Sequence, residues 1–261
     1  MSVKVIWALI LRHWYLLPRS IDRLTDYLFW PLLDVLIWGL ATNWIVDVSD
    51  ANQNVLPTIL TGLVYFRVTW QTNYEIGVNL LEESWNKNLT NLLSTPMSKL
   101  DWLAANLILS LLKLIPVLTV QTSAIWLIYE VHVLHLNLMT AMHLGILIVF
   151  GWTIGLVASS LFIILGIRAQ ALTWTLAFIF APLAAVYFPL SLLPEPVRLF
   201  SLLLPITYVF EDLRHSLLSL DPALLSLRHS FLLGLAMLSL AIYGFNHAFE
   251  RTRKRGFEHL E

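Results

Sequence analysis

The stretch Leu138–Ile167, LMTAMHLGILIVFGWTIGLVASSLFIILGI, runs for thirty residues without a single Asp, Glu, Lys or Arg. An α-helix rises about 1.5 Å per residue, so roughly 20 apolar residues cross the hydrocarbon core of a bilayer, which is about 30 Å thick. The stretch is long enough to span a membrane. It therefore predicts an integral membrane protein.

The composition of the whole chain agrees with this prediction. Of 261 residues, 58% are hydrophobic and 13% are charged, and the mean hydropathy is +0.73. A soluble domain is about 45–50% apolar and about 25% charged. So little charge could not cover a soluble surface, which excludes a conventional cytosolic enzyme, a disordered protein and a nucleic-acid binder. The chain has no Cys, which excludes a disulfide, a thiol nucleophile and a Cys-ligated metal.

Six stretches are long and apolar enough to cross a membrane. The expected spans are Tyr27–Val46, Val55–Asn73, Trp102–Ile128, Leu138–Ile167, Ala171–Leu190 and Ser230–Phe249. No internal repeat or linker divides the chain. Residues 1–261 are therefore expected to form one all-α transmembrane domain with six membrane-spanning helices.

The basic residues predict the orientation of these spans. With the N-terminus in the cytoplasm, eleven Lys and Arg residues fall on the cytoplasmic side, three fall on the other side, and two lie inside spans. Cytoplasmic loops of membrane proteins carry such an excess of Lys and Arg. We therefore expect a multi-pass protein of the cytoplasmic (inner) membrane with both termini in the cytoplasm.

The N-terminal segment, residues 1–24, is amphipathic when it is read as a helix. Its apolar face carries Val3, Ile6, Trp7, Ile10, Trp14 and Leu17, and its polar face carries Lys4, Arg12, Tyr15 and Arg19. This pattern predicts an interfacial helix that lies along the membrane surface. The alternative is an ordinary soluble amphipathic helix.

The loop after the second span predicts a short helix at the membrane edge. Trp85, Leu89 and Leu92 fall at i, i+4 and i+7 and share one helical face with Leu93. The rest of the surface is polar and carries Glu82, Glu83, Asn86, Lys87, Thr90 and Asn91. Pro96 disfavours helix at the residue before it, so we expect a helix over Glu82–Ser94. Such a helix either docks into a partner's groove or lies on the lipid surface.

A second irregular segment follows the fifth span. The apolar run Val197–Leu204 is too short to cross a membrane, and three prolines bracket it: Pro194, Pro196 and Pro205. Broken backbone at membrane depth is tolerated only inside protein or beside a cavity. The segment therefore predicts a re-entrant or interfacial pair of short helices, in which Glu211 and Arg214 can pair at i and i+3.

Together, these two segments resemble the ABC-2 family of ATP-binding-cassette exporter permeases. In that family the first segment reads approximately E-R-x-x-G-T-L-E-x-L-L-x-[ST]-P-[LM]-S. The matching residues here are Glu83, Leu89, Leu92, Leu93, Thr95, Pro96, Met97 and Ser98 in the first segment, and Pro205, Thr207, Tyr208, Glu211 and Arg214 in the second. Lys87 and Asn88 stand where the family usually has Gly and Thr.

The resemblance implies that the chain is the transmembrane permease of an exporter rather than an enzyme. ATP and Mg would be bound by a separate ATPase subunit, present in two copies, and this chain would hold no cofactor or metal. Two ATPases need two permeases, as a homodimer or as a heterodimer with a relative. The expected cargo is drug-like, lipid-linked or glycan. The segment Glu82–Ser94 would be the coupling helix, and its expected ATPase contacts are Glu82, Glu83, Trp85, Asn86, Lys87, Leu89, Asn91 and Leu92.

Several polar residues interrupt the expected spans. They are Asp34, Arg67, Gln71, Glu75 and Lys113. Arg67, Gln71 and Glu75 are spaced by four and form a polar stripe, for which Asp34 and Lys113 are candidate partners. A charge in the middle of a bilayer is costly and normally faces protein or water. The group is therefore either the lining of a translocation pathway or a set of structural ion pairs.

Motifs for covalent chemistry are missing from the sequence. It contains no G-x-x-x-x-G-K-[ST] loop, no H-E-x-x-H zinc helix and no G-x-S-x-G elbow. His132 and His135, three residues apart, are interpreted as solvent-facing loop residues. Two rivals to the exporter remain. A polytopic membrane enzyme would need a nucleophile or metal set, and a passive channel or secondary transporter often shows an inverted repeat.

Overall fold

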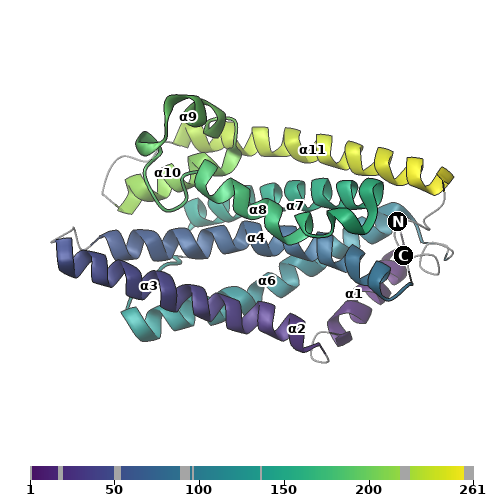
Figure 1. Ribbon diagram of the computed structural model, residues 1–261, viewed down its shortest axis with the longest axis horizontal. Helices are drawn as coiled ribbons and strands as arrows, with labels where there is room; N and C mark the ends of the chain where they lie inside the picture. Colours follow the sequence, from purple (N-terminus) through teal and green to yellow (C-terminus); the bar gives the residue numbers. More distant parts are fainter. Residues whose placement is uncertain are drawn as a thin grey trace.

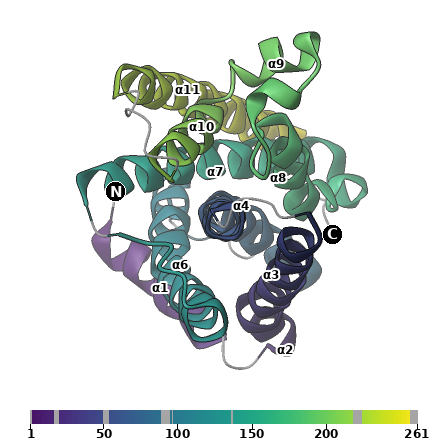
Figure 2. The same cartoon turned by 90° about the vertical axis from the view of Figure 1, so that its left-hand side faces the viewer.

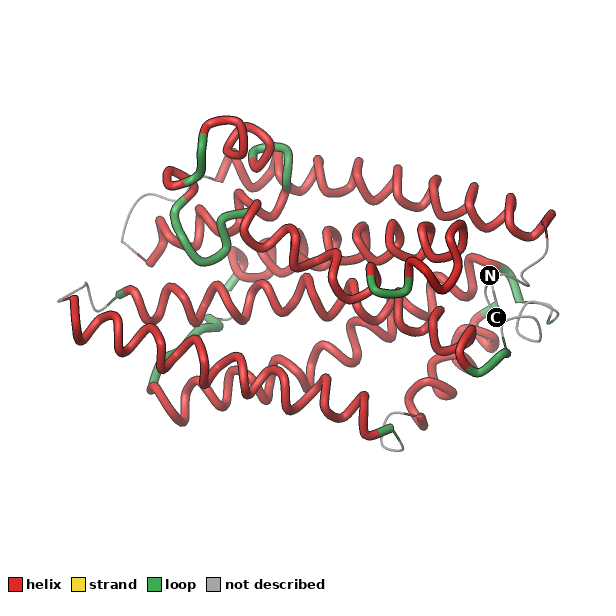
Figure 3. Tube along the Cα trace, viewed as in Figure 1, coloured by secondary structure: helices red, strands yellow, loops and turns green. Residues whose placement is uncertain are grey.

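The computed structural model describes residues 2–16, 20–49, 54–88, 95, 97–135, 137–217 and 224–255, and in these ranges it consists of helices and loops without a strand (Figure 3). The helical elements are α1 (Val3–Leu16), α2 (Ile21–Leu24), the π-helical turn η2 (Thr25–Phe29), α3 (Trp30–Ser49), α4 (Val55–Trp85), α6 (Lys99–Tyr129), α7 (Leu138–Leu165), the 3-10 turn η3 (Gly166–Ala169), α8 (Leu172–Leu183), the 3-10 turn η4 (Leu190–Leu192), α9 (Glu195–Ser201), α10 (Pro205–Leu217) and α11 (Leu224–Arg255). The long helices run side by side along the long axis (Figure 1).

Helix α4 is the central element of this bundle. Figure 2 shows it surrounded by α3, α6, α7 and α8, and it packs against all four. Every residue from Leu60 to Leu81 is buried. Because Leu60–Leu81 is buried, the polar side chains of this part of α4 must find their partners inside the protein.

Helix α7 crosses α4 closely because glycine faces the crossing. A Cβ atom added at Gly151 would stand 1.9 Å from the Thr72 hydroxyl oxygen and 2.6 Å from the backbone oxygen of Thr69. At Gly155 it would stand 2.9 Å from the backbone oxygen of Asn73. Small residues at such positions let two helix backbones approach each other.

Four helical stretches are long and apolar enough to cross a membrane: Thr25–Ser49, Lys99–Tyr129, Leu138–Ala169 and Leu227–Lys254. They overlap four of the six expected spans, so the structure confirms an all-helical chain with membrane-spanning potential. The stretch Val55–Asn73 lies within α4. That helix is 31 residues long but too polar to meet the same criterion.

The expected span Ala171–Leu190 is wrong in its extent, because α8 is only 12 residues long and ends at Leu183. The cause is local. Pro182 stands in the last turn of α8, and Ala185 adopts a left-handed φ of 52°, which turns the chain out of the helix. The chain then passes through η4 into α9 and α10. The two short helices expected in this region are present.

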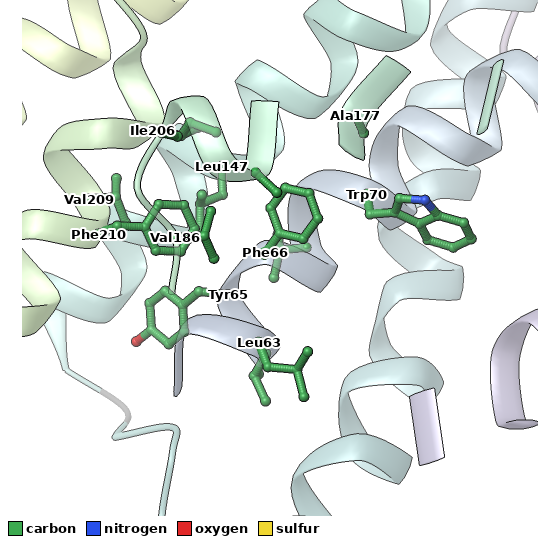
Figure 4. Packing of buried hydrophobic residues seen from close by; sticks show 14 of the residues in the cluster. Leu63, Tyr65, Phe66, Trp70, Leu147, Ala177, Val186, Ile206, Val209 and Phe210 are labelled. Carbon is green, nitrogen blue, oxygen red and sulfur yellow. The ribbon is translucent and has the colours of Figure 1, made fainter. Parts of the chain in front are cut away.

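Two apolar clusters hold the bundle together. The larger one joins α4, α7, α8 and α10. Figure 4 shows Tyr65 and Phe66 of α4 near Leu147 of α7 and Val186, with Phe210 of α10 beside them. The second cluster joins α1, α4, α6, α7 and α11.

The sequence predicts one helix over residues 1–24, whereas the structure has two helices in this segment, α1 and α2. The apolar face of α1 is divided. Leu9 and Ile10 are buried in the second cluster, and α1 packs on α6. Val3, Trp7 and Trp14 are exposed. One edge of the helix therefore seats it on the bundle, and the other edge remains available to a further surface.

Candidate functional site

A groove runs along one side of α4, between α2–α3 and α8. Its floor is a single stripe of α4: Arg67, Trp70, Tyr74, Val78, Glu82 and Trp85. One wall carries Ser20, Arg23, Asp26, Trp30 and Asp34, and the other carries Trp174 and Phe178. Its volume is about 630 Å³, within the roughly 300–1,000 Å³ that is typical of small-molecule sites.

An ion pair bridges the groove near the middle of α4. Arg67 Nη2 donates to Asp34 Oδ2 of α3 over 2.5 Å, and the guanidinium carbon lies 4.8 Å from the centre of the Trp70 ring. The Arg67 side chain is 6% exposed and that of Asp34 is 36% exposed. The structure thus pairs Arg67 with Asp34, one of the candidate partners, and it places the carboxylate on the open side.

Behind the groove, Glu75 is the centre of a fully buried cluster. Lys113 Nζ of α6 lies 2.7 Å from Glu75 Oε2, and Gln71 Nε2 donates to Glu75 Oε1 over 3.0 Å. The hydroxyl of Tyr27 donates to the same oxygen. The expected stripe of Arg67, Gln71 and Glu75 is therefore split between two neighbours. A helix turns about 100° per residue, so side chains eight positions apart diverge by about 80°, which directs Arg67 toward α3 and Glu75 toward α6.

The C-terminal end of α4 is tied to the N-terminal helices. Arg23 Nε donates to Glu82 Oε1 over 2.6 Å, and Arg12 Nη2 lies 2.8 Å from Glu83 Oε1. Beside them, burial and the nearby charges of Lys113, Arg23 and Arg12 lower the pKa of His13 to about 3, so this imidazole is neutral. These two ion pairs form what we call the N-terminal clamp.

The helix expected over Glu82–Ser94 is not continuous. Glu82, Glu83 and Trp85 belong to the last turn of α4, which ends at Trp85 with Asn86 as its C-cap. Lys87 then adopts a left-handed φ of 51°. The chain turns at Asn86, Lys87 and Asn88 instead of continuing as a helix. The 3.6-residue spacing of the apolar residues could not predict this turn, because hydrophobic periodicity does not detect a helix cap.

The remaining expected coupling residues, Leu89, Asn91 and Leu92, lie outside the described residues. Asn86 and Lys87 are exposed, and Glu83 is buried. Trp85 is 52% exposed, and its ring centre lies 6.3 Å from that of Trp174 of α8. Its indole nitrogen donates to Gln170 Oε1 over 3.3 Å. Trp85 therefore contacts the turn before α8 as well as lining the groove.

The segment around α10 holds the turn after α8. Arg214 Nη2 donates to Glu211 Oε1 over 2.6 Å, which confirms the expected pairing, and to the backbone oxygen of Ala185 over 2.7 Å. The Thr207 hydroxyl donates to the backbone oxygen of Ser201, and the Tyr208 hydroxyl donates to that of Leu202. Pro205 begins α10 and is buried. These residues fix local backbone and lie apart from the groove.

Sequence reasoning missed a buried pair and part of the groove lining. His143 Nε2 of α7 lies 2.8 Å from Asp212 Oδ2 of α10, and both side chains are nearly inaccessible. The signal was a lone histidine in the otherwise apolar run of α7. The groove residues Arg23, Asp26 and Phe178 were also missed, because they come from separate elements that no spacing links.

Among the described residues, no group of three or more His, Asp or Glu side chains is placed to hold a metal ion. No protein-family model matches the chain, and no curated protein matches it.

Proposed function

We propose that the chain is the membrane subunit of an ATP-driven exporter of the ABC-2 type and works with a separate ATPase. Three features support the proposal: the two motif segments, the four apolar helices, and a groove of suitable size beside a buried central helix. A polytopic enzyme or a passive channel would not need the two motif segments.

In this proposal α4 is the second of six membrane crossings, and the fifth combines α8, which is about 18 Å long, with the buried non-helical turn that follows it. Both termini lie in the cytoplasm of a cell with an inner membrane. At 31 residues, α4 is about 46 Å long, which exceeds the hydrocarbon thickness of about 30 Å. Its charged side chains are paired inside the protein, so they do not face lipid. We place α9 and α10 at the opposite membrane surface from the N-terminal clamp, because they lie at the other end of the molecule (Figure 1).

The observation that carries the proposal is the continuity of α4. One helix forms the floor of the groove and also contains the first residues of Glu82–Ser94, which we call the coupling segment. The N-terminal clamp holds the last turn of this helix through Arg12–Glu83 and Arg23–Glu82. A push on the coupling segment by a closing ATPase would therefore move α4 together with α1 and α2. The groove lies along this moving unit.

The Arg67–Asp34 pair gives this motion two defined states. The pair crosses from the floor of the groove to the α3 wall, so α3 can move away from α4 only if the two charges separate. Packed interfaces with such discrete contacts switch between arrangements rather than deform continuously. Each chain supplies one coupling segment, and two ATPases need two, so the working unit is a dimer of permeases with two ATPases.

The decisive experiment measures recovery of an ABC-type ATPase with the tagged chain from its native membranes, followed by ATP hydrolysis by the isolated complex. In the double variant Lys87→Glu/Asn91→Glu, like charge at the interface should reduce ATPase recovery and transport, because such juxtaposition costs several kcal/mol. The variant should still insert and fold. Glu130→Lys, an exposed change at the other end of α6, is the control that should retain recovery.

Wild-type ATPase recovery with the double variant would remove the segment after α4 as the docking site. Failure to recover any ATPase with the wild-type chain would overturn the exporter. The orientation of the spans in the membrane has its own test. A reporter fused after Glu261 should be active only in the cytoplasm, and one inserted at Asp50 should be active only outside.

A further inference from the structure

We propose that the part of the groove around Trp70 binds apolar aromatic molecules that carry a carbonyl-type hydrogen-bond acceptor, and that such molecules are the cargo class of the exporter. The cargo assignment rests on the proposed function. The binding itself depends only on how Trp70 and its neighbours line the groove.

Both faces of the Trp70 ring are occupied by its neighbours on α4. The Tyr74 ring stacks on it, with the ring centres 4.9 Å apart and an angle of 16° between the planes. The Arg67 guanidinium carbon lies 4.8 Å from the centre of the Trp70 ring. Tyr74 stands one helical turn after Trp70 and Arg67 one turn before it, so they cover opposite faces of the indole. What remains for a ligand is the edge of the ring.

The edge of the Trp70 ring offers a hydrogen-bond donor that has no acceptor. An aromatic edge is the positive end of the ring quadrupole, and the indole nitrogen can only donate. This nitrogen is buried, and no atom of the described residues accepts its hydrogen. Trp70 is 8% exposed and lines the groove. Buried donors in native proteins almost always have an acceptor, so we expect a molecule in the groove to supply one.

Aromatic side chains form the walls beside this donor. Trp30 of α3 is 47% exposed, and Phe178 of α8 is 56% exposed. The Phe178 ring centre lies 6.1 Å from that of Trp70. Exposed side chains change rotamer within nanoseconds, so the Phe178 ring can turn aside and open the Trp70 edge to the groove. Rings on two walls give flat apolar contact area to a ligand that is itself aromatic.

The ion pair beside Trp70 does not require a charged ligand. Arg67 Nη2 donates to Asp34 Oδ2, so each of these two charges already has its partner. A carbonyl oxygen suits the indole donor, because it accepts a hydrogen bond without bringing a donor that needs a partner of its own. An apolar aromatic molecule with one carbonyl group therefore matches both the walls and the floor.

Two probes that differ in one group test this binding. Benzophenone has two phenyl rings joined by a carbonyl group, whereas diphenylmethane has the same rings joined by a methylene group, which has no acceptor. The full chain in phosphatidylcholine nanodiscs is irradiated with radiolabelled benzophenone, whose excited carbonyl forms a covalent bond at nearby C–H groups, and the labelled residues are located by mass spectrometry. Unlabelled benzophenone and diphenylmethane then compete for this labelling, and the concentration of each in the lipid is measured with empty nanodiscs.

We expect saturable labelling on α3, α4 or α8 beside the groove. At equal concentration in the lipid, diphenylmethane should compete at least about tenfold less well than benzophenone, because it leaves the buried donor of Trp70 without an acceptor. Equal competition by the two probes, labelling that does not saturate, or saturable labelling away from the groove would each overturn the inference.

Two variants test the role of the Trp70 donor. Trp70→Phe removes the N–H but keeps an aromatic ring between Arg67 and Tyr74, and it should weaken competition by benzophenone at least about tenfold. Diphenylmethane should compete as it does in the wild type, which also shows that the groove is still folded. Trp44→Phe changes an indole that is 66% exposed on α3 outside the groove and should leave both probes unchanged. A preference for benzophenone that persists in Trp70→Phe would overturn the inference, and if that variant does not fold, the wild-type ratio of the two probes decides.

This measurement needs no ATPase, so its failure can be told apart from failure of the exporter. An ATPase that co-purifies with a chain that does not prefer benzophenone would leave the exporter intact and remove the aromatic cargo. A preference for benzophenone in a chain that recruits no ATPase would leave the binding site intact and remove the exporter.

Discussion

Helices α3 and α4 are neighbours, yet they are built in opposite ways. On α3 the buried residues are Pro31, Val35, Gly39 and Thr42, and most of its apolar side chains are exposed. On α4 every residue from Leu60 to Leu81 is buried, including charged and amide side chains. The exposed helix is thus the apolar one and the central helix is the polar one, the reverse of the arrangement in a soluble protein.

The difference shows what surrounds the bundle. An exposed apolar surface of this extent is stable only against an apolar environment, and four helical stretches are long and apolar enough to cross a membrane. Helix α7 shows that a buried helix here need not be polar, because it packs on α4 with almost no polar side chains beyond His143 and hydroxyls. The polar residues of α4 therefore reflect specific pairings.

The largest effect should follow from breaking the most deeply buried pairing. Glu75→Leu leaves the Lys113 ammonium, whose side chain is 0% exposed, without its partner. Removing one member of a buried ion pair costs about 3–5 kcal/mol. We expect a large loss of folded protein and a lower thermal midpoint, measured by size-exclusion chromatography of heated detergent samples.

The double variant Glu75→Leu/Lys113→Leu should recover much of this loss, because two apolar side chains often replace a buried ion pair without penalty. Lys99–Glu250 is the matched control, since these side chains are 35% and 38% exposed. Lys99→Leu should change stability by less than about 1 kcal/mol. Similar losses at the two sites would contradict the difference between a buried and an exposed charge.

The next effect tests whether α4 is held tightly by its neighbours. Gly151→Ala places a Cβ against the backbone of Thr69 and the hydroxyl of Thr72, neither of which can move far. Overpacking of this kind costs about 1–3 kcal/mol. At Gly244, on α11, an added Cβ meets nothing within 4 Å, and alanine is a better helix former than glycine by about 1 kcal/mol. Gly244→Ala should therefore leave stability unchanged or raise it. Equal thermal midpoints for the two variants would show that α7 does not press on α4.

Part of this organisation can be predicted from the sequence, and part of it cannot. The apolar runs predict the helices because burial in lipid requires about 20 consecutive apolar residues, so α7 and most of α6 are evident. The pairing of Arg67 with Asp34 follows because a charge in a span needs a partner. Helix α4 shows the limit: hydropathy measures transfer of a helix into lipid, but this helix contacts protein instead.

The groove could be predicted only in part. Arg67 and Asp34 stood out as charges, whereas Arg23 and Asp26 looked like ordinary residues outside the spans, and Glu82 was expected to contact an ATPase. Their role depends on how α2 and η2 lie against α4, which local spacing does not encode. The prediction of where α4 ends was wrong for another reason. The chain leaves the helix at Asn86, and Lys87 adopts a positive φ, which a periodic pattern of leucines does not reveal.

A smaller effect is expected for the pair that lies between the two helices being compared. Arg67→Leu leaves Asp34 without its partner, but the Asp34 side chain is 36% exposed and can be solvated. We expect a loss of about 1–2 kcal/mol, between the values for exposed and buried pairs. Arg67→Leu/Asp34→Leu should restore thermal stability. If the double variant is no better than the single variant, the guanidinium serves the groove rather than the α3–α4 contact.

The smallest effect extends the comparison to α1, which joins the polar interior through His13. Burial, together with the charges of Lys113, Arg23 and Arg12, lowers the pKa of His13 from its ordinary value of 6.5 to about 3. Between these two values the unfolded chain binds a proton that the folded chain does not. Stability must therefore fall as the pH falls below about 6.5. From pH 7.5 to pH 5.5 the loss from this group is about 1.4 kcal/mol. His13→Leu removes the proton and keeps an apolar side chain against the bundle, so its thermal midpoint should fall less than that of the wild type over the same range. If both proteins lose the same amount, His13 is protonated in the folded state and α1 does not share the interior of the bundle.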